Sequence, residues 1–520
     1  NIPLDIARPL GRFIRYGLTY LGAEIGGLIG VYLIGYLIVS LNTILTYSII
    51  RHIAPFPVAV IGALAFCLFP ADTTKILITH SLQLQVGLTF SLIAIILYQH
   101  GRYILPYILA MCCLLTYEST VLPLLAAPFL GKQLSNRIGR EITGHVAIII
   151  ALLAIVLLSR HFLGETRVAG LGNANPVIPL GRAWMAMAIG PMASFAMYLY
   201  RPVTVLLEGG ISTYLVMAVY SCMTFVFVKK IWGDANINTG KHESTYSTKL
   251  IPFQIRINYS PDTGRALILL ITGIVLWFIS YAFAFSKDHW PPVTVEGRMT
   301  SVHLAATFAS ALTVAAMIWF VYIALAVRRK KTTVVIALAS VYFSFLAGFA
   351  YIVQEDLARS WKYQKEFWHQ VISLVPDIDE KTTIFFFNKY DNLKKTKYIY
   401  THSWANTIVL DRVYRFKYNA YYKIDQPVYR FQRPGDSIIS HMKLVGDKIR
   451  YKAGKIGGGT VETEIKQRDL VVLYMDKDGK LHRHKGYFAS NNFKFMLKNP
   501  SAPTHLPRTG LYDLIMGETG

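Results

Sequence analysis

The chain has 520 residues, of which 53% are hydrophobic and 16% charged, and its mean hydropathy is +0.38. This composition excludes an ordinary water-soluble protein and predicts a polytopic membrane protein with a soluble part. The net charge of +23 does not call for a nucleic-acid partner, because basic cytoplasmic loops and attraction to anionic lipid headgroups account for it in a membrane protein. All four cysteines lie inside apolar runs, so we expect neither a disulfide framework nor a thiolate metal site.

The N-terminal 26 residues mix apolar side chains with arginines, which is typical of an amphipathic helix lying along the membrane interface. Because the chain begins at Asn1 without a methionine, we expect a further segment before it. Residues 183–200 are apolar enough to cross a membrane, but counting them as a span breaks the alternation of loop charge. We interpret them as an interfacial or re-entrant helix. The predicted spans are 27–50, 56–69, 82–98, 103–117, 119–130, 145–163, 203–228, two on either side of the loop 286–300, and 332–353.

Loop charges set the orientation of these spans. Basic turns follow the first span and recur at every second turn, ending with the run 328–331, and this places those turns in the cytoplasm. The opposite turns carry Asp72 and Glu118, which we therefore place outside. The alternation gives about ten spans, or eleven with one before Asn1. It delivers everything after the last span to the outer face of the membrane.

From Glu355 onward the composition becomes polar, aromatic and basic, with 28 lysines and arginines against 18 acidic residues. Short runs with strand character alternate with two segments of helical spacing, at 361–373 and 404–416. The sequence therefore predicts a transmembrane domain, residues 1–354, and a small extramembrane α/β domain, residues 355–520. The predicted strands are 382–387, 437–442, 448–452 and 470–474, with the last two antiparallel to each other.

Ionisable groups at membrane depth are costly and usually mark a functional site. Asp72 follows the turn at Pro70 and has oxygen ligands for a divalent cation, although capping the helix that follows is its structural alternative. His80 lies two helical turns away and can pair with it. Glu118 lies between two apolar runs, beside Tyr117, and needs a partner.

Three further groups of polar residues are candidates, and the first two are predicted to lie at the outer face. Arg160 and Arg167 flank the end of a span, where they can clamp a phosphate or extend to the headgroups. Asp288 and His289 lie in the outer loop 286–300, which either covers a cavity or is simply solvated. Arg8 lies on the N-terminal helix and contacts either lipid headgroups or a substrate phosphate.

Four stretches, in this order, resemble the GT-C-type membrane glycosyltransferases, including the protein O-mannosyltransferase superfamily and its bacterial relatives. The resemblance covers roughly residues 1–390. Phe69-Pro70 stands where that family usually has His-Pro. The stretches are DIARPL at Asp5–Leu10 with Asn42, Tyr47 and Arg51 after it, ALAFCLFPADTTK at Ala63–Lys75, LLTYESTVLP at Leu114–Pro123, and WKYQKEFWHQVISLVPDIDEKTT at Trp361–Thr383.

The resemblance implies a GT-C-like fold and a polyprenyl-phosphate-linked sugar donor. It also implies an acceptor on the outer face, whether glycan, lipid or protein, and an acidic base in the first outer loop. Most of that loop would precede Asn1, which leaves Asp5 as the nearest candidate. Bacterial relatives imply the inner membrane, with residues 355–520 on the periplasmic side. The candidate catalytic residues are Asp5, Asp72 and Glu118; the candidate substrate-binding residues are Arg8, His80, Tyr117, Arg160, Arg167, Asp288 and His289; and Asp72 is the candidate ligand of a Mg²⁺ or Mn²⁺ ion.

Two other classes of protein remain open from the sequence. A non-catalytic membrane subunit would keep this scaffold and pack within a larger membrane complex. A transporter would carry paired broken helices at the midplane, whereas the strongest ionisable residues of this chain lie at the ends of spans.

Overall fold

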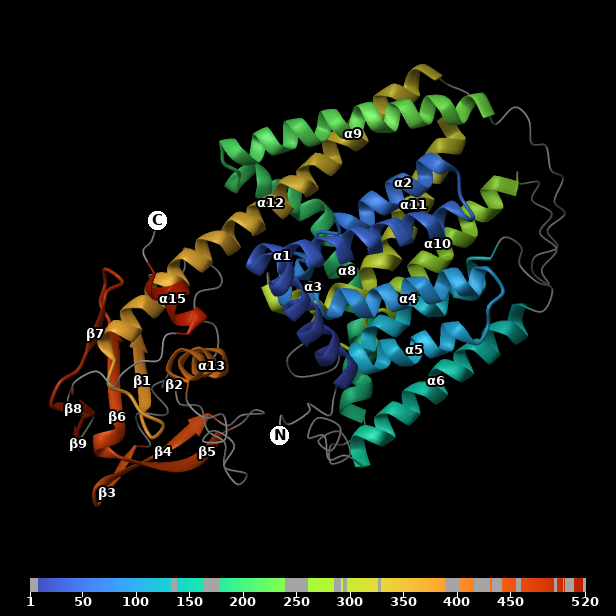
Figure 1. Ribbon diagram of the computed structural model, residues 1–520. Helices are drawn as coiled ribbons and strands as arrows, with labels where there is room; N and C mark the ends of the chain where they lie inside the picture. The colour runs from blue at the N-terminus through green and yellow to red at the C-terminus, as the bar shows by residue number, and fades with distance from the viewer. Residues whose placement is uncertain are drawn as a thin grey trace. The chain divides into compact units, whose positions relative to one another are not determined.

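The computed structural model describes residues 8–131, 138–162, 177–238, 261–284, 291–292, 297–325, 329–388, 403–415, 431–432, 442–454, 460–490, 493–498, 500 and 509–517 (Figure 1). The chain separates into two compact units, residues 1–354 and residues 355–520. The second unit begins at the residue where the composition turns polar.

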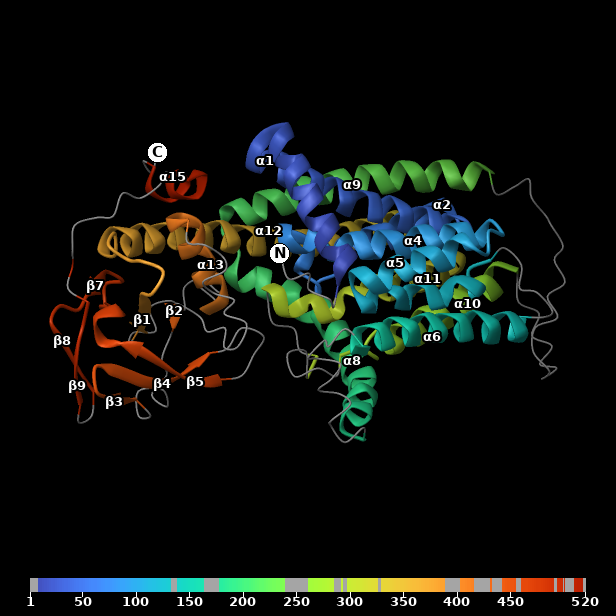
Figure 2. The same ribbon diagram turned by 60° about the horizontal axis from the view of Figure 1, so that its bottom comes forward.

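The described part of the first unit is helical. In its core α11 packs against α2 and α10, and η2 contacts α4, α10 and α11. Figure 2 shows α4, α5 and α6 running side by side. The helices are α1 Pro9–Arg51, α2 Phe56–Cys67, the 3-10 helix η1 Thr74–Ile76, α3 Ile78–Ser81, α4 Leu84–Gln99, α5 Leu105–Thr116, the 3-10 helix η2 Glu118–Phe129, α6 Ile138–Phe162, α8 Val177–Glu208, α9 Ile211–Asn238, α10 Pro261–Ile279, the 3-10 helix η4 Gly297–His303, α11 Leu304–Leu325 and α12 Arg329–Leu374, whose last turns belong to the second unit.

Among the described residues, six helices are long and apolar enough to cross a membrane, so the chain is a polytopic helical membrane protein. This number is smaller than the ten or eleven expected spans. Four of the ten expected spans account for the difference. Helices α2, α4 and α5 have only 12, 16 and 12 residues at a rise of about 1.5 Å per residue, and the fourth, η2, is a 3-10 helix of 12 residues. The six are Pro9–Arg51, Ile138–Phe162, Ile211–Lys230, Asp262–Ile279, Thr300–Ala324 and Thr333–Leu374.

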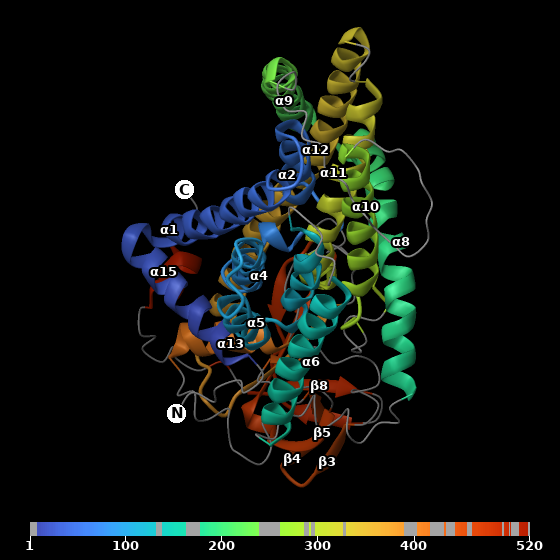
Figure 3. The ribbon, with the colours of Figure 1, turned by 90° about the vertical axis from the view of Figure 1, so that its right-hand side faces the viewer.

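Helix α1 bends sharply at Gly26 and Gly27, where the expected interfacial helix gives way to the first expected span (Figure 3). Gly27 has φ +59°, a conformation that glycine adopts without the steric cost of a side chain. The bend brings the backbones on its two sides into contact. A Cβ atom on Gly30 would lie 2.1 Å from the carbonyl oxygen of Gly22. The bend therefore depends on glycine at these positions.

Gly30→Ala should destabilise the first unit by about 1–3 kcal/mol, because the added methyl group collides with backbone rather than with a movable side chain. Thermal unfolding of the full chain in detergent measures this. Gly17→Ala is the matched control, since nothing lies within 4 Å of its would-be Cβ and alanine favours helix. Equal unfolding midpoints for the two variants would contradict the packing described here.

The segment after Glu118 is a 3-10 helix of 12 residues rather than the expected α-helical span. Pro123 and Pro128 lie inside it, and each lacks the backbone N–H that an α-helix would use at that position. Such long 3-10 segments are uncommon. Buried contacts with α4, α5, α10 and α11 hold it in place.

The expected boundary between the interfacial helix 183–200 and the span 203–228 is wrong. Helix α8 continues to Glu208 in spite of two internal prolines, and the chain breaks at Gly209 and Gly210 before α9 begins. Prolines are tolerated inside membrane helices because neighbouring groups satisfy the freed backbone carbonyls, whereas each of the two glycines lowers helix propensity by about 1 kcal/mol relative to alanine. Trp277 of α10 donates to Ser194, which ties α8 to the bundle at 2.9 Å.

The second unit combines a four-stranded sheet, in the order β2-β1-β6-β7, with a three-stranded sheet, β3-β4-β5, and a hairpin, β8-β9. Strand β1 runs parallel to β2 and β6, and the remaining pairs are antiparallel. The described elements are β1 Thr383–Asn388, α13 Ser403–Tyr414, β2 Phe431–Gln432, β3 Lys443–Val445, β4 Lys448–Gly454, β5 Thr460–Lys466, the 3-10 helix η7 Gln467–Asp469, β6 Leu470–Met475, β7 Leu481–Arg483, β8 Tyr487–Ser490, β9 Phe493–Met496 and α15 Gly510–Met516.

Alternate residues of β1 face two different cores, as the pleat of a strand requires. Ile384 and Phe386 pack with α12, α13 and α15, whereas Phe385 packs with Tyr451 of β4. The expected pairing of 448–452 with 470–474 is wrong, because β4 lies between β3 and β5 while β6 lies between β1 and β7. Short strands carry too little pattern to select partners. The expected strand 437–442 lies almost wholly outside the described residues.

A buried ion pair joins the turn after α12 to β7 within this unit. Arg483 donates to both oxygens of Asp377 at 2.5 and 3.1 Å, and their side chains are 4% and 1% exposed. The same guanidinium donates to the carbonyl oxygens of Leu374 and Lys498. These additional bonds offset much of the cost of removing both charges from water.

Asp377→Ala should destabilise the second unit by about 3–5 kcal/mol, because it leaves a buried guanidinium without its carboxylate. Thermal unfolding of the full chain, followed by limited proteolysis of the second unit, measures the effect. Glu464→Ala is the control, since its pair with Arg450 is exposed and should hardly matter. A comparable loss of stability in both variants would show that the buried Asp377–Arg483 pair matters no more than an exposed one.

Candidate functional site

Glu118 lies at one end of the helix bundle, where α5 has just ended and α4 begins. Tyr117 has an extended backbone, with φ −162° and ψ 116°, and this turns the chain from α5 into η2. Helix α1 passes close by, since a Cβ on Gly11 would lie 2.8 Å from both Gln83 and the carbonyl oxygen of Thr116. The opposite end is marked by Gln99, whose amide donates to the carbonyl oxygen of Leu130.

Two arginines from distant segments converge on the Glu118 carboxylate. Arg8, just before α1, donates from Nη2 at 2.9 Å and from Nε at 3.2 Å. Arg160, in the last turn of α6, donates from Nη1 to Oε1. The side chains of Arg8, Glu118 and Arg160 are 25%, 19% and 5% exposed. The structure thus brings two guanidiniums and one carboxylate together, largely withdrawn from solvent.

Neighbouring groups fix the orientation of both arginines. The Arg8 guanidinium lies over the Tyr117 ring, 4.2 Å from its centroid, in cation–π geometry. Arg160 donates from Nη2 to the carbonyl oxygen of Leu114, in the last turn of α5, where helix carbonyls lack intrahelical partners. Arg8, Tyr117, Glu118 and Arg160 therefore form one contact group, which we call the Glu118 cluster.

Asp72 lies apart from this cluster and makes structural contacts. It is 3% exposed, and its Oδ1 accepts from the backbone N–H and the hydroxyl of Thr74 at 2.9 and 2.6 Å. Thr307 of α11 reaches its Oδ2 at 3.5 Å. These bonds fit the structural alternative, in which Asp72 caps the turn that follows it. No side chain bonds both Asp72 and Glu118 among the described residues.

Residues near Asp72 lock the same turn to the rest of the bundle. Lys75 donates to the carbonyl oxygens of Phe66 and Cys67, at the end of α2, both at 2.7 Å. Thr73 bonds Thr300 through its backbone N–H at 3.1 Å and through its hydroxyl at 3.0 Å.

His80 lies on the short helix α3 with its ring half-buried. It is not among the groups bonded to Asp72, whose oxygens are occupied by Thr74 and Thr307, so the expected pair does not form.

Among the described residues, Asp72 offers few ligands for the expected Mg²⁺ or Mn²⁺ ion. No group of three His, Cys, Asp or Glu side chains comes together within the described ranges. Asp72 is a single carboxylate among hydroxyls that already bond one another, whereas Mg²⁺ usually retains waters and carboxylate or phosphate ligands. The described residues around Asp72 do not fit the ion, and no step below uses one.

Four predicted site residues lie outside the described residues. They are Asp5, Arg167, Asp288 and His289.

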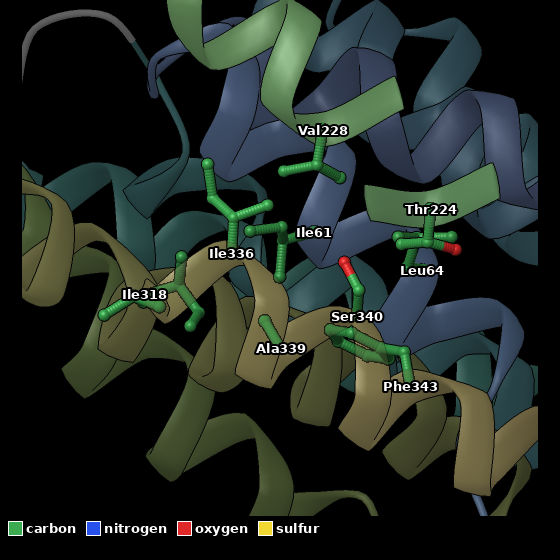
Figure 4. A pocket seen from close by; sticks show the side chains of 10 residues that line it. Ile61, Leu64, Thr224, Val228, Ile318, Ile336, Ala339, Ser340 and Phe343 are labelled. Atoms are coloured by element: carbon green, nitrogen blue, oxygen red, sulfur yellow. The ribbon is translucent and has the colours of Figure 1, made fainter. Parts of the chain in front are cut away.

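A pocket between α2, α9, α11 and α12 has a different character from the Glu118 cluster (Figure 4). Thr224 and Ser340 carry the only hydroxyls among its lining side chains, and none of these side chains is charged. This lining suits hydrocarbon rather than an anionic substrate. The lining residues are Ile61, Leu64, Thr224, Val228, Ile318, Val335, Ile336, Ala339, Ser340 and Phe343.

Sequence reasoning singled out each member of the Glu118 cluster but did not pair Arg8 or Arg160 with Glu118. It missed Thr300 and Thr307, the partners of the Asp72 turn, because threonines in apolar helices are common and more than 200 residues of chain separate them from it.

No family model, no curated protein and no solved structure matches this chain.

Glu118→Ala should destabilise the first unit by about 3 kcal/mol, because it leaves two guanidiniums close together with no carboxylate between them. Thermal unfolding of the purified full chain in detergent measures this. Glu141→Ala is the control, because that carboxylate is exposed in the first turn of α6. An unfolding midpoint unchanged by Glu118→Ala would show that the cluster contributes nothing to the fold.

Proposed function

We propose that this chain is a GT-C-like membrane glycosyltransferase that transfers a sugar from a polyprenyl-phosphate-linked donor to an acceptor at the outer face of the membrane. The observation that carries the proposal is the convergence of Arg8 and Arg160 on Glu118, at one end of an apolar bundle. The order of the four family-like stretches supports it, because the cluster draws on two of them. The acceptor is a glycan, a lipid or a protein.

In this proposal the two arginines bind the donor phosphate. A guanidinium presents parallel N–H donors that match phosphate oxygens, and it keeps its charge in a site with little water. The bond that breaks lies between the sugar and the phosphate oxygen, so cations held beside that oxygen stabilise the departing lipid phosphate.

Glu118 has a positioning role here rather than that of a general base. Its two oxygens already accept from both guanidiniums, which leaves it badly placed to take a proton from an acceptor. Asp72 is also excluded as the base by its burial and its bonds to Thr74. The base is then another carboxylate, and Asp5 is the candidate that the family resemblance implies.

The same proposal places the protein in a bacterial inner membrane, with residues 355–520 on the periplasmic side. The choice of membrane follows from the resemblance to bacterial relatives, and the side of residues 355–520 follows from the alternation of basic and acidic turns along the first unit.

Arg8→Lys and Arg160→Lys should each lower kcat/KM for transfer from a short-chain polyprenyl-phosphate sugar roughly 100-fold, because a point charge replaces a fork of donors. Transfer by the full chain in nanodiscs, with donor binding followed separately by native mass spectrometry, measures both steps. Arg51→Lys is the control, since its guanidinium serves the turn after α1 by donating to the carbonyl oxygen of Ala54. Equal losses of kcat/KM in all three variants would argue against a phosphate site at the cluster.

A second candidate is a non-catalytic subunit of a larger membrane complex. The specific observation in its favour is that Asp72 and Glu118, the two described carboxylates predicted to be catalytic, are both engaged in structural bonds. Stoichiometric partners in mild detergent, together with no bound isoprenoid lipid and no transfer by the unmodified chain, would favour the subunit over the enzyme.

A further inference from the structure

The three-stranded sheet of the second unit has one face packed and one face bare. Ile449, Tyr451 and Ala453 of β4 point into the core shared with β1 and β6. The residues that alternate with them point the other way, together with their cross-strand partners on β3 and β5. We call this side the hairpin face; its residues are Lys443, Val445, Lys448, Arg450, Lys452, Glu462, Glu464 and Lys466.

The hairpin face is strongly basic. It carries five lysines and arginines against two glutamates, and the register sets Lys443 opposite Arg450 and Lys448 opposite Lys466. Like charges directly across a ladder destabilise it, so these pairs have no explanation in the stability of the sheet itself. Glu464 neutralises only part of the charge by accepting from Arg450 at 2.7 Å.

Exposed aliphatic side chains border these charges. Val445 of the hairpin face is 45% exposed, and Leu444, one residue earlier and therefore on the opposite side of the strand, is 36% exposed. Val445 begins the tight turn between β3 and β4, where Gly446 has φ +63°. The turn therefore presents Val445 among the basic side chains of the hairpin face, with Leu444 exposed on the other side of the same strand.

We propose that the hairpin face docks on anionic phospholipid headgroups, with the aliphatic turn entering the interface. Lysines and arginines attract anionic lipid, while aliphatic side chains gain free energy only if the partner has an apolar layer beneath its charges. A nucleic acid or an acidic polysaccharide offers no such layer. The chain that carries this face is itself anchored in a membrane by α12, so lipid is present at high local concentration. The proposal is independent of the proposed enzymatic function.

Photo-crosslinking of the full chain in nanodiscs tests this proposal. A benzophenone amino acid replaces Val445, and intact mass identifies what it captures. We expect a lipid adduct in nanodiscs that contain phosphatidylglycerol, and several-fold less in pure phosphatidylcholine. Each basic residue near an anionic surface changes partitioning roughly fivefold, so salt at about 0.5 M should also suppress the adduct.

Charge-reversal variants provide the matched comparison. Lys443→Glu, Lys448→Glu and Lys452→Glu together should abolish the adduct in anionic nanodiscs. The control carries the same change in charge on exposed lysines of the same unit outside the hairpin face: Lys477→Glu, Lys480→Glu and Lys485→Glu. An adduct that is insensitive to lipid charge, equally lost in both triple variants or absent throughout would overturn the proposal. Crosslinking to a second protein chain instead of lipid would overturn it as well.

Discussion

A carboxylate inside an apolar helix bundle needs counter-charges, and the rest of the first unit is arranged around the way Glu118 obtains them. Arg8 and Arg160 come from the two ends of a stretch of more than 150 residues, yet both donate to the same carboxylate. The ion cluster thereby fixes the start of α1 and the end of α6 against the turn between α5 and η2. Buried ion pairs are seldom the most stabilising solution available to a fold, so retaining one suggests a role beyond stability.

The two acidic turns of the bundle, at Asp72 and at Glu118, have different roles. The Asp72 turn is closed by hydroxyl groups from its own residues and from α11, and it anchors the short helices η1 and α3. The Glu118 cluster instead combines charge, partial exposure and an aromatic ring. Of these two arrangements, the second brings two guanidiniums together, which is why the proposed phosphate site lies there.

Much of the fold follows from the sequence, because long apolar runs and the polar shift at Glu355 depend on composition alone. The break of α1 at Gly26 and Gly27 could also be predicted from the sequence, since two adjacent glycines end the amphipathic segment. Tertiary packing decided the remainder. Nothing local tells the chain that α8 survives two prolines, or that β4 and β6 belong to different sheets. Glu118 and Arg160 could each be singled out as costly charges, but their contact depends on how α5 and α6 pack.

A double-mutant cycle on Glu118 and Arg160 tests the central claim most directly. Glu118→Gln, Arg160→Gln and the combined variant would be compared with the unmodified chain by unfolding in detergent. If the two side chains form the ion pair described, the two single variants should together lose at least about 1 kcal/mol more free energy of unfolding than the double variant loses. If the sum of the two single losses equals the loss of the double variant to within about 0.5 kcal/mol, the two groups do not interact. The account of this site would then be wrong.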